Sequence, residues 1–497
     1  MTNDVRATAD AAGASAADSV FYRHRWLILA VVLAAECMDL IDSTVVNVAA
    51  PQIARQFHAS STSLQWIVGG YPLAIAVGLI TGGRLGDLIG RKRMFLIGAA
   101  GFVLASTLCG LAPDTTVLIA ARLIQGGFAA LMLPQGFGIL REVFPPDERQ
   151  QAFAIFGPVI GFSAVLGPII GGSLIDWNLF GSGWRLVFLV NVPLGIAAII
   201  GAARLLPPSL PDHGTRLDLT GTALVSGFAV LVVYPLIQGR VYGWPWWTYT
   251  MIAVGVGLLL VFAAHQRRRD AAGRAPLVTP SVFGHRGYSA GLVFAMLFFS
   301  GMGGALLCAT LFLQIGQGFT PIHAAVCTVP LSVGLVIGAG LSGGVLGPKF
   351  GRRTLQAGLA VSVLGWVLLA VALRGHATIG FLDLMPGLLV TGVGLGLVVA
   401  PMFDIILASV TDAETGSASG VLNAGQQLAN AIGVAVLGTI FFDAIASGDF
   451  HLGLRRVLMV QIGTTLALLA LSPLLPRFAR EPETAPGVEL ELAEVKA

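Results

Sequence analysis

Charged residues are scarce in this chain. Only 11% of its 497 residues are Asp, Glu, Lys or Arg, against roughly 25% in ordinary globular domains. Hydrophobic residues make up 55%, far more apolar surface than soluble domains of this length could bury. A net charge of only +3, with no long basic stretch, also excludes a nucleic-acid-binding surface. The solvent for most of this chain is therefore expected to be lipid.

The residues that build catalytic and metal centres are also few and scattered. Disulfide frameworks and zinc sites need cysteines at paired spacings, and the four cysteines instead lie singly in apolar runs. The eight histidines are isolated, and no GxxxxGK[ST] phosphate-binding loop is present. We therefore expect no enzyme, no metal, no cofactor and no nucleotide. The cysteines expected to be buried thiols are Cys37, Cys109, Cys308 and Cys327.

Long apolar runs recur along the chain, and each is long enough to cross a hydrocarbon core of roughly 30 Å as a helix. The fold class predicted is an all-α polytopic membrane protein with fourteen transmembrane helices. Residues 1–20 lack the apolar core of a secretory signal peptide and are expected to be a cytoplasmic tail. The predicted spans are 26–49, 64–83, 94–112, 116–140, 151–175, 184–205, 219–238, 246–264, 287–316, 322–346, 353–373, 380–409, 416–442 and 453–475.

The basic residues support this count. If fourteen spans start from a cytoplasmic N-terminus, most of the 29 Lys and Arg fall in the inner segments, and Arg122 alone lies well inside a span. Cytoplasmic loops of membrane proteins carry such an excess. A missed helix would reverse the assignment downstream of the error. The pattern therefore predicts a multi-pass membrane protein with both termini cytoplasmic. Arginine is far more frequent than lysine and alanine is abundant, a composition associated with high-GC bacteria, so the expected location is the bacterial inner membrane.

One sequence repeat divides the chain. The loop Gly83–Lys92, GRLGDLIGRK, follows the second span, and GVLGPKFGRR at Gly344–Arg353 follows the tenth. Two equivalent six-helix bundles are a known transporter architecture, so spans seven and eight would be an insertion between them. The expected parts are a tail at 1–25, an N-terminal bundle at 26–205, two inserted helices with a linker at 206–286, a C-terminal bundle at 287–480 and a tail at 481–497.

The first span contains three acids, Glu36, Asp39 and Asp42, three residues apart. A charged side chain at the centre of a spanning helix costs about 2.5–3.5 kcal/mol or more. Three carboxyls in one low-dielectric place cannot all be ionised cheaply, so this cluster is predicted to handle protons. The spacing does not choose between Asp39 and Asp42 as the main site. Arg122, which stays protonated, is expected to compete for one acid, and a permanent structural ion pair is the alternative.

Five motifs in order resemble the fourteen-span drug:proton antiporters of the major facilitator superfamily. The first-span motif is Asp42-x-Thr44-Val45-Val46-Asn47, which favours Asp42 as the proton site. Leu118-x-x-x-Arg122-x-x-Gln125-Gly126 resembles the fourth-span signature, whose arginine the family uses in proton transfer. Ser419-Gly420-Val421-Leu422-Asn423 with Gln427 resembles a signature near the end of the chain. The residues of the cytoplasmic gate motif are Gly83, Asp87, Gly90, Arg91 and Lys92, and those of the fifth-span antiporter motif are Gly167, Pro168, Gly171 and Gly172.

Some positions depart from the family pattern. The basic residue usual after the gate aspartate is Leu88, and the second copy of the loop has Pro348 in place of the aspartate. By spacing alone, Asp87 is an ordinary solvated loop charge, and only the resemblance implies a latch. Ser163 replaces a glycine of the antiporter motif. Small residues let helices approach closely, so the remaining glycines predict a tight helix contact.

The residues and the resemblance together predict a monomeric, proton-driven exporter of lipophilic drugs or antibiotics. Its expected partners are a small lipophilic substrate, protons and the lipid bilayer. An acidic, Phe-rich cavity suits lipophilic cations without excluding neutral compounds. The polar residues expected to contact the substrate are Tyr71, Gln135, Gln314, Asn423 and Gln427. Two alternatives stay open, namely a dedicated exporter of one natural product, lipid or siderophore, and a proton-coupled nutrient importer.

Overall fold

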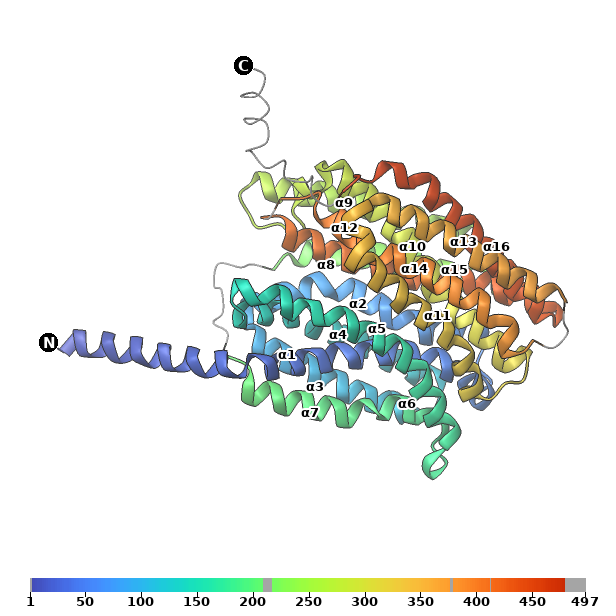
Figure 1. Cartoon of the computed structure of the whole chain (residues 1–497), viewed down its shortest axis with the longest axis horizontal. Helices are drawn as coiled ribbons and strands as arrows, with labels where there is room; N and C mark the ends of the chain where they lie inside the picture. The colour runs from blue at the N-terminus through green and yellow to red at the C-terminus, as the bar shows by residue number, and fades with distance from the viewer. Residues whose placement is uncertain (1, 209–216, 376–378, 412, 479–497) are drawn as a thin grey trace, which may run out of the picture.

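The computed structural model describes residues 2–208, 217–375, 379–411 and 413–478. Over these residues the chain is helical and contains no strand. Figure 1 shows long helices lying nearly parallel, with the N-terminal helices in blue to green on one side and the C-terminal helices in yellow to red on the other. The predicted tail at 481–497 lies outside the described residues, whereas helix α1 already begins at Thr2.

Within the described residues, the N-terminal half contains six long helices, one short α-helix and two 3-10 turns, Leu179–Gly181 and Gly183–Arg185. Asp114 caps α4 by accepting from two backbone amides of its first turn, as expected of an N-cap aspartate. The helices are α1 (Thr2–Phe57), α2 (Ser61–Ile89), α3 (Arg91–Gly110), α4 (Thr115–Val143), α5 (Pro146–Trp177), α6 (Leu186–Leu189) and α7 (Asn191–Leu205).

The C-terminal half repeats this order. Its helices are α10 (Arg286–Leu311), α11 (Pro321–Leu341), α12 (Gly347–Phe350), α13 (Arg352–Gly375), α14 (Phe381–Leu407), α15 (Thr415–Ala444) and α16 (Phe450–Leu471). The packing repeats as well. Helix α4 packs most extensively on α2 and α3, as α14 does on α11 and α13, and the pair α1–α5 corresponds to α10–α15.

The repeated loop has the same construction in both halves. Gly90 and Gly351 join consecutive helices with positive φ angles of 102° and 51°, a region that glycine adopts more readily than other residues. Lys92 Nζ then donates to the carbonyl of Leu206, just after α7. In the second half, Arg352 Nη1 donates to Leu475 O, just after α16. Each loop thus ties the third helix of its half to the end of the sixth.

Among the described residues, twelve helices are long and apolar enough to cross a membrane. Their positions follow the predicted spans, although several helices extend further; α2, for example, runs on to Ile89. Two predicted spans are not among the twelve. The first contains the three acids of α1, and the apolar part of α5, Gly161–Trp177, is shorter than the others.

The inserted helices α8 (Leu219–Gln238) and α9 (Trp246–Ala271) lie beside one of the two seams between the halves. Helix α8 packs on both α2 and α15. The hydroxyls of Thr222 on α8 and Thr81 on α2 hydrogen bond at 2.9 Å, and Thr439 on α15 donates to Leu236 O at 3.3 Å. The other seam is formed by α5 and α11.

Candidate functional site

The three acids of α1 lie in three different environments, and Asp42 is the most enclosed. Asp42 and Arg122 of α4 form an ion pair, and both side chains are 0% exposed. The second carboxylate oxygen of Asp42 accepts from Gln125 Nε2 and from Asn191 Nδ2, each at 2.8 Å. A buried charge is tolerated only when it is paired and hydrogen bonded, and this carboxylate meets both conditions.

Arg122 is held on several sides. Its Nε donates to Ile67 O at 3.2 Å, and its Nη1 donates to Gln125 Oε1 at 2.7 Å. The guanidinium lies 4.2 Å from the centre of the Tyr71 ring, within the range of a cation–π contact. Its Nη2 has no hydrogen-bond partner among the described residues. The guanidinium therefore keeps one donor available for another acceptor.

Asp39 is joined to this pair through Tyr71. The tyrosine hydroxyl donates a hydrogen bond to Asp39 Oδ1, while its ring lies under Arg122. The Tyr71 side chain, predicted to contact the substrate, is only 1% exposed and is occupied by these two contacts. Tyr71 thus connects the second acid of α1 to the buried ion pair.

Glu36 is the most accessible of the three acids. Its side chain is half-buried, and no hydrogen bond to it is found among the described residues. Successive acids stand about 4.5 Å apart along the helix axis, since each residue rises 1.5 Å. The set therefore runs from the half-buried Glu36, through Asp39, to the enclosed Asp42.

The gate motif lies where α2 meets α3. Arg91 is 3.2 Å from Asp87 and 3.3 Å from Glu142 of α4, and all three side chains are partly exposed. Gly86 is needed for packing, because a Cβ there would overlap the side chain of Gln135. A Cβ on Gly83 would lie 3.6 Å from Pro134 Cβ, which is an ordinary van der Waals contact. All these contacts lie within the N-terminal half.

The fifth-span motif packs α5 against both halves. A Cβ on Gly167 would lie 2.0 Å from Thr44 Oγ1, and one on Gly171 would lie 3.2 Å from Val45 of α1. A Cβ on Gly172 would lie 2.8 Å from the Cα of Ile322, on α11 of the other half. Three glycines thus permit close helix contacts on two sides of α5, as the motif predicts.

The halves meet at the end of the bundle opposite the gate motif. There Gln314 Nε2 donates to Val48 O at 2.9 Å, and the Ile322 amide donates to Asp176 Oδ2 at 3.0 Å. At the same end, Gln65, near the start of α2, donates to Ala435 O of α15 at 3.0 Å. These bonds hold the two halves together at that end.

The other predicted substrate contacts fall into two groups. Gln135 donates to Gly82 O and Leu131 O, both at 2.9 Å, so it joins helices, as Gln314 does. On α15, Asn423 is exposed and Gln427 is half-buried. No hydrogen bond to either is found in the part of the chain that the structure describes, and these two amides are open to a ligand.

Sequence reasoning missed Asn191 and Ser106. Asn191 Nδ2 contacts Asp42 and also lies 3.1 Å from Ser106 Oγ, which donates to Phe188 O. A signal was present, because Asn191 is the sole amide in the predicted span 184–205. Within the described ranges, no three His, Cys, Asp or Glu side chains gather in a way that could hold a metal ion.

This sequence is similar to known membrane transporters. Residues 32–434 match the family model of the Major Facilitator Superfamily. The chain is 48% identical to a probable actinorhodin transporter of Streptomyces coelicolor, over 86% of this chain and 74% of the relative. It is 35% identical to a puromycin resistance protein of Streptomyces alboniger, over 85% and 83%. It is 34% identical to a tetracenomycin C resistance and export protein of Streptomyces glaucescens, over 84% and 76%.

Solved structures share the fold at lower identity. A transporter of the POT family in complex with a thioalcohol-conjugated peptide has a TM-score of 0.66 at 16% identity, over 90% of this chain and 96% of that chain. A D-xylose-proton symporter has a TM-score of 0.64 at 16% identity, over 91% and 98%. At these identities the likeness concerns the fold alone.

Proposed function

This chain belongs to the Major Facilitator Superfamily, and we propose that it is a proton-driven exporter of lipophilic antibiotics. It is a transporter and not an enzyme, and it moves a small molecule across a membrane. Relatives named for actinorhodin transport, puromycin resistance and tetracenomycin C export support the substrate class. The observation that carries the proton coupling is the enclosed Asp42–Arg122 pair at the end of a line of three acids.

The coupling step follows from charge balance. A proton that reaches Asp42 neutralises its carboxylate, and Arg122 then loses its counter-ion in a place without solvent. A buried charge without a partner is costly, so the guanidinium must move to another acceptor. In the part of the chain that the structure describes, its Nη2 has no hydrogen-bond partner. Because Asp42 lies on α1 and Arg122 on α4, protonation changes how these helices hold each other.

Glu36 and Asp39 supply the route to that site. The half-buried Glu36 takes up a proton first, and Asp39 with Tyr71 passes the change on to the buried pair. Each proton that crosses the membrane brings about 2.3 kcal/mol per 100 mV of membrane potential. This energy drives the two halves between states open to opposite sides. The close contacts of α5 with α1 and α11 would close the path between the two halves on one side of the membrane.

We further propose that α1 and α5 both span the membrane, which gives fourteen spans with the twelve apolar helices. Residues 26–205 and 287–480 would form the moving bundles, and residues 206–286 the inserted pair with its linker. The protein would lie in the bacterial inner membrane as a monomer, with both termini in the cytoplasm. The excess of arginine in the loops assigned to the inside supports this orientation.

A narrower role is favoured by one observation. Actinorhodin and tetracenomycin C are single compounds, and each appears in the name of one relative. An exporter dedicated to one natural product would have the same proton site and a more selective cavity.

Efflux from intact cells tests the export proposal. Bacteria that express the protein should accumulate several-fold less puromycin or ethidium than cells carrying the empty vector. A protonophore that collapses the proton gradient should abolish the difference. If only one compound of a wide panel is expelled, the dedicated role holds. Proton-dependent accumulation of a labelled nutrient, with no efflux, would establish an importer and overturn the proposal.

A further inference from the structure

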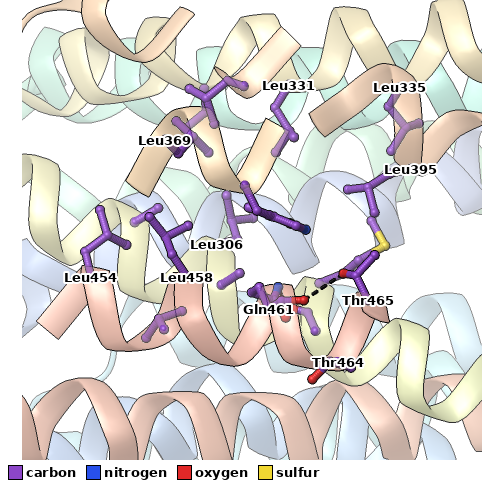
Figure 2. A pocket seen from close by; sticks show the side chains of 18 of the residues that line it. Leu306, Leu331, Leu335, Leu369, Leu395, Leu454, Leu458, Gln461, Thr464 and Thr465 are labelled. Carbon is purple, nitrogen blue, oxygen red and sulfur yellow. Dashed lines mark hydrogen bonds between the residues drawn. The ribbon is translucent and has the colours of Figure 1, made fainter. Parts of the chain in front are cut away.

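The C-terminal half contains a cavity of about 220 Å³. Figure 2 shows it surrounded by leucines and, on α16, by a small polar group. Five helices of this half contribute to its wall, namely α10, α11, α13, α14 and α16. One leucine from each is Leu306, Leu331, Leu369, Leu395 and Leu458.

The corresponding interior of the other half contains buried polar and charged groups. Helices α1, α2, α4 and α7 correspond to α10, α11, α14 and α16, because they pack on one another in the same order. In the N-terminal half, these helices enclose the ion pair of Asp42 and Arg122 with the amides of Gln125 and Asn191. In the C-terminal half, the matching space is apolar and hollow. The proposed proton site and the cavity thus occupy equivalent places in the two halves.

The cavity reaches the seam between the halves. Thr44 of α1 and Pro168 of α5 are the two residues of the N-terminal half that line it. Thr44 lies two residues from Asp42, and Pro168 belongs to the fifth-span motif. A molecule in the transport pathway would meet this opening, whereas on the outer side α13 packs against α16. This position favours a transported molecule as the occupant over a lipid chain.

Gln461 gives the apolar wall one hydrogen-bonding feature. The side chain is 4% exposed, and its Nε2 donates to Gly301 O at 2.9 Å. This bond fixes which end of the amide is the oxygen. No partner of Oε1 is found among the described residues. The Thr465 hydroxyl donates to the backbone carbonyl of Gln461 at 2.7 Å and stabilises this turn of α16 (Figure 2). A ligand with a hydroxyl or amine donor would satisfy the free oxygen.

The volume limits what fits. An apolar cavity of about 150 Å³ holds a benzene molecule, while sites for whole drug-sized ligands occupy roughly 300–1,000 Å³. The cavity lies between these sizes. We infer that the cavity is a substrate subsite. It binds the neutral aromatic part of the substrate, which is a single ring or two fused rings. A donor group on that part hydrogen bonds to Gln461 Oε1. This inference rests on the proposed export function and names the part of the substrate that the C-terminal half recognises.

Binding to the purified protein tests the subsite independently of transport. Trp366 lines the cavity, so a brominated aromatic ligand should quench its fluorescence. The probes are 6-bromo-2-naphthol, which has a donor, and 2-bromonaphthalene, which has none. Saturable quenching should appear in the wild type and disappear in Trp366→Phe, which identifies the signal. Quenching that persists in Trp366→Phe would place the probe elsewhere and overturn the inference.

Two variants then test the position and the hydrogen bond. Ala305→Phe fills the cavity from α10 and should abolish saturable quenching. Val293→Phe, on an exposed face of the same helix, should leave quenching unchanged. Gln461→Met should weaken naphthol binding about five-fold, as expected for the loss of one neutral hydrogen bond. It should leave bromonaphthalene binding intact, which also shows that the variant is folded. Equal binding of naphthol to wild type and Gln461→Met would contradict the assigned role of Gln461.

Lipid is the competing occupant. Protein in nanodiscs whose phospholipids carry brominated acyl chains should show no quenching of Trp366 beyond that of the Ala305→Phe variant. If brominated lipid quenches Trp366 and bromonaphthol does not, the cavity holds an acyl chain and the inference fails. Saturable naphthol binding with no drug efflux in cells would instead refute the export function and leave the ring-binding site standing.

Discussion

Asp42 and Arg122 lie 80 positions apart in the sequence and form an ion pair in which neither side chain has any exposed surface. Gln125 and Asn191 complete the hydrogen bonds of the carboxylate. An enclosed pair of this kind stays stable only while both charges are present. A proton delivered to it therefore has a structural effect, and this effect is the basis of the proposed coupling.

The first prediction concerns this pair. Asp42→Asn should abolish proton-driven transport and lower stability by about 3–5 kcal/mol, because Arg122 is left as an uncompensated buried charge. The double variant Asp42→Asn/Arg122→Gln should be inactive yet more stable than Asp42→Asn. Thermal unfolding in detergent measures the order of stability of these variants. A double variant whose loss equals the sum of the two single losses would show that the residues do not interact.

The second prediction separates Tyr71 from general packing. Tyr71→Phe keeps the ring beneath Arg122 and removes the hydroxyl that donates to Asp39. Transport should slow roughly ten-fold, in keeping with about 1.5 kcal/mol for a hydrogen bond to a charged group. The melting temperature should change little. Tyr71→Leu, which also removes the ring, should reduce both. Unchanged transport by Tyr71→Phe would remove Tyr71 from the proton route.

The third prediction concerns the contact between the halves at Gly172. Gly172→Val places a side chain against the backbone of Ile322, and overpacking of this kind costs about 1–3 kcal/mol. Because the strain arises only while this end of the bundle is closed, export should fall several-fold. Gly463→Val on α16 is the matched control, since nothing lies within 4 Å of a Cβ there. Equal export by both variants would show that the α5–α11 contact does not limit transport.

The fourth prediction concerns the linker before α10. Glu414 accepts hydrogen bonds from Ser281 and Thr411, and His285 Nε2 lies 3.0 Å from it. These donors lower the pKa of Glu414 from its ordinary 4.5 to about 2. Since a lowered carboxyl pKa stabilises only the ionised form, the contribution is complete above about pH 4.5 and is lost as the pH falls through about 2. The attachment of the linker to Glu414 should therefore not change between pH 5 and 8.

Hydrogen exchange of residues 277–285 checks this. Glu414→Gln should reduce protection of the linker amides at pH 7. Asp449→Asn should leave it unchanged, because Asp449 caps α16 and is not among the acceptors that hold the linker. If protection in the wild type fell steadily from pH 8 to pH 5, a group other than Glu414 would hold the linker.

The general fold could be predicted from the sequence because lipid imposes long apolar helices, and their run lengths appear directly in the residues. The transporter family and the exporter class could be predicted as well, from motifs whose spacing the superfamily shares. The repeat at Gly83 and Gly344 also indicated the two halves. These features depend on local sequence, which is why one chain is enough to find them.

The contacts inside the halves could not be predicted in the same way. Three acids at a spacing of three present similar faces, and only the packing of α4 and α7 distinguishes the enclosed Asp42 from the half-buried Glu36. The same reason explains Gln135 and Gln314, which join helices here although their polarity suggested substrate contact. The hollow C-terminal half left no sequence signal, because leucines that line a cavity look like leucines that fill a core.

Proton movement in proteoliposomes tests the central claim most directly. Purified protein is reconstituted in vesicles with an acidic interior, and an interior pH dye is followed when an exported drug such as puromycin is added. The account predicts drug-dependent alkalinisation of the lumen by the wild type and none by Asp42→Asn, with Gly463→Val behaving like the wild type. Drug uptake with no change in lumenal pH, or an unchanged proton signal in Asp42→Asn, would contradict it.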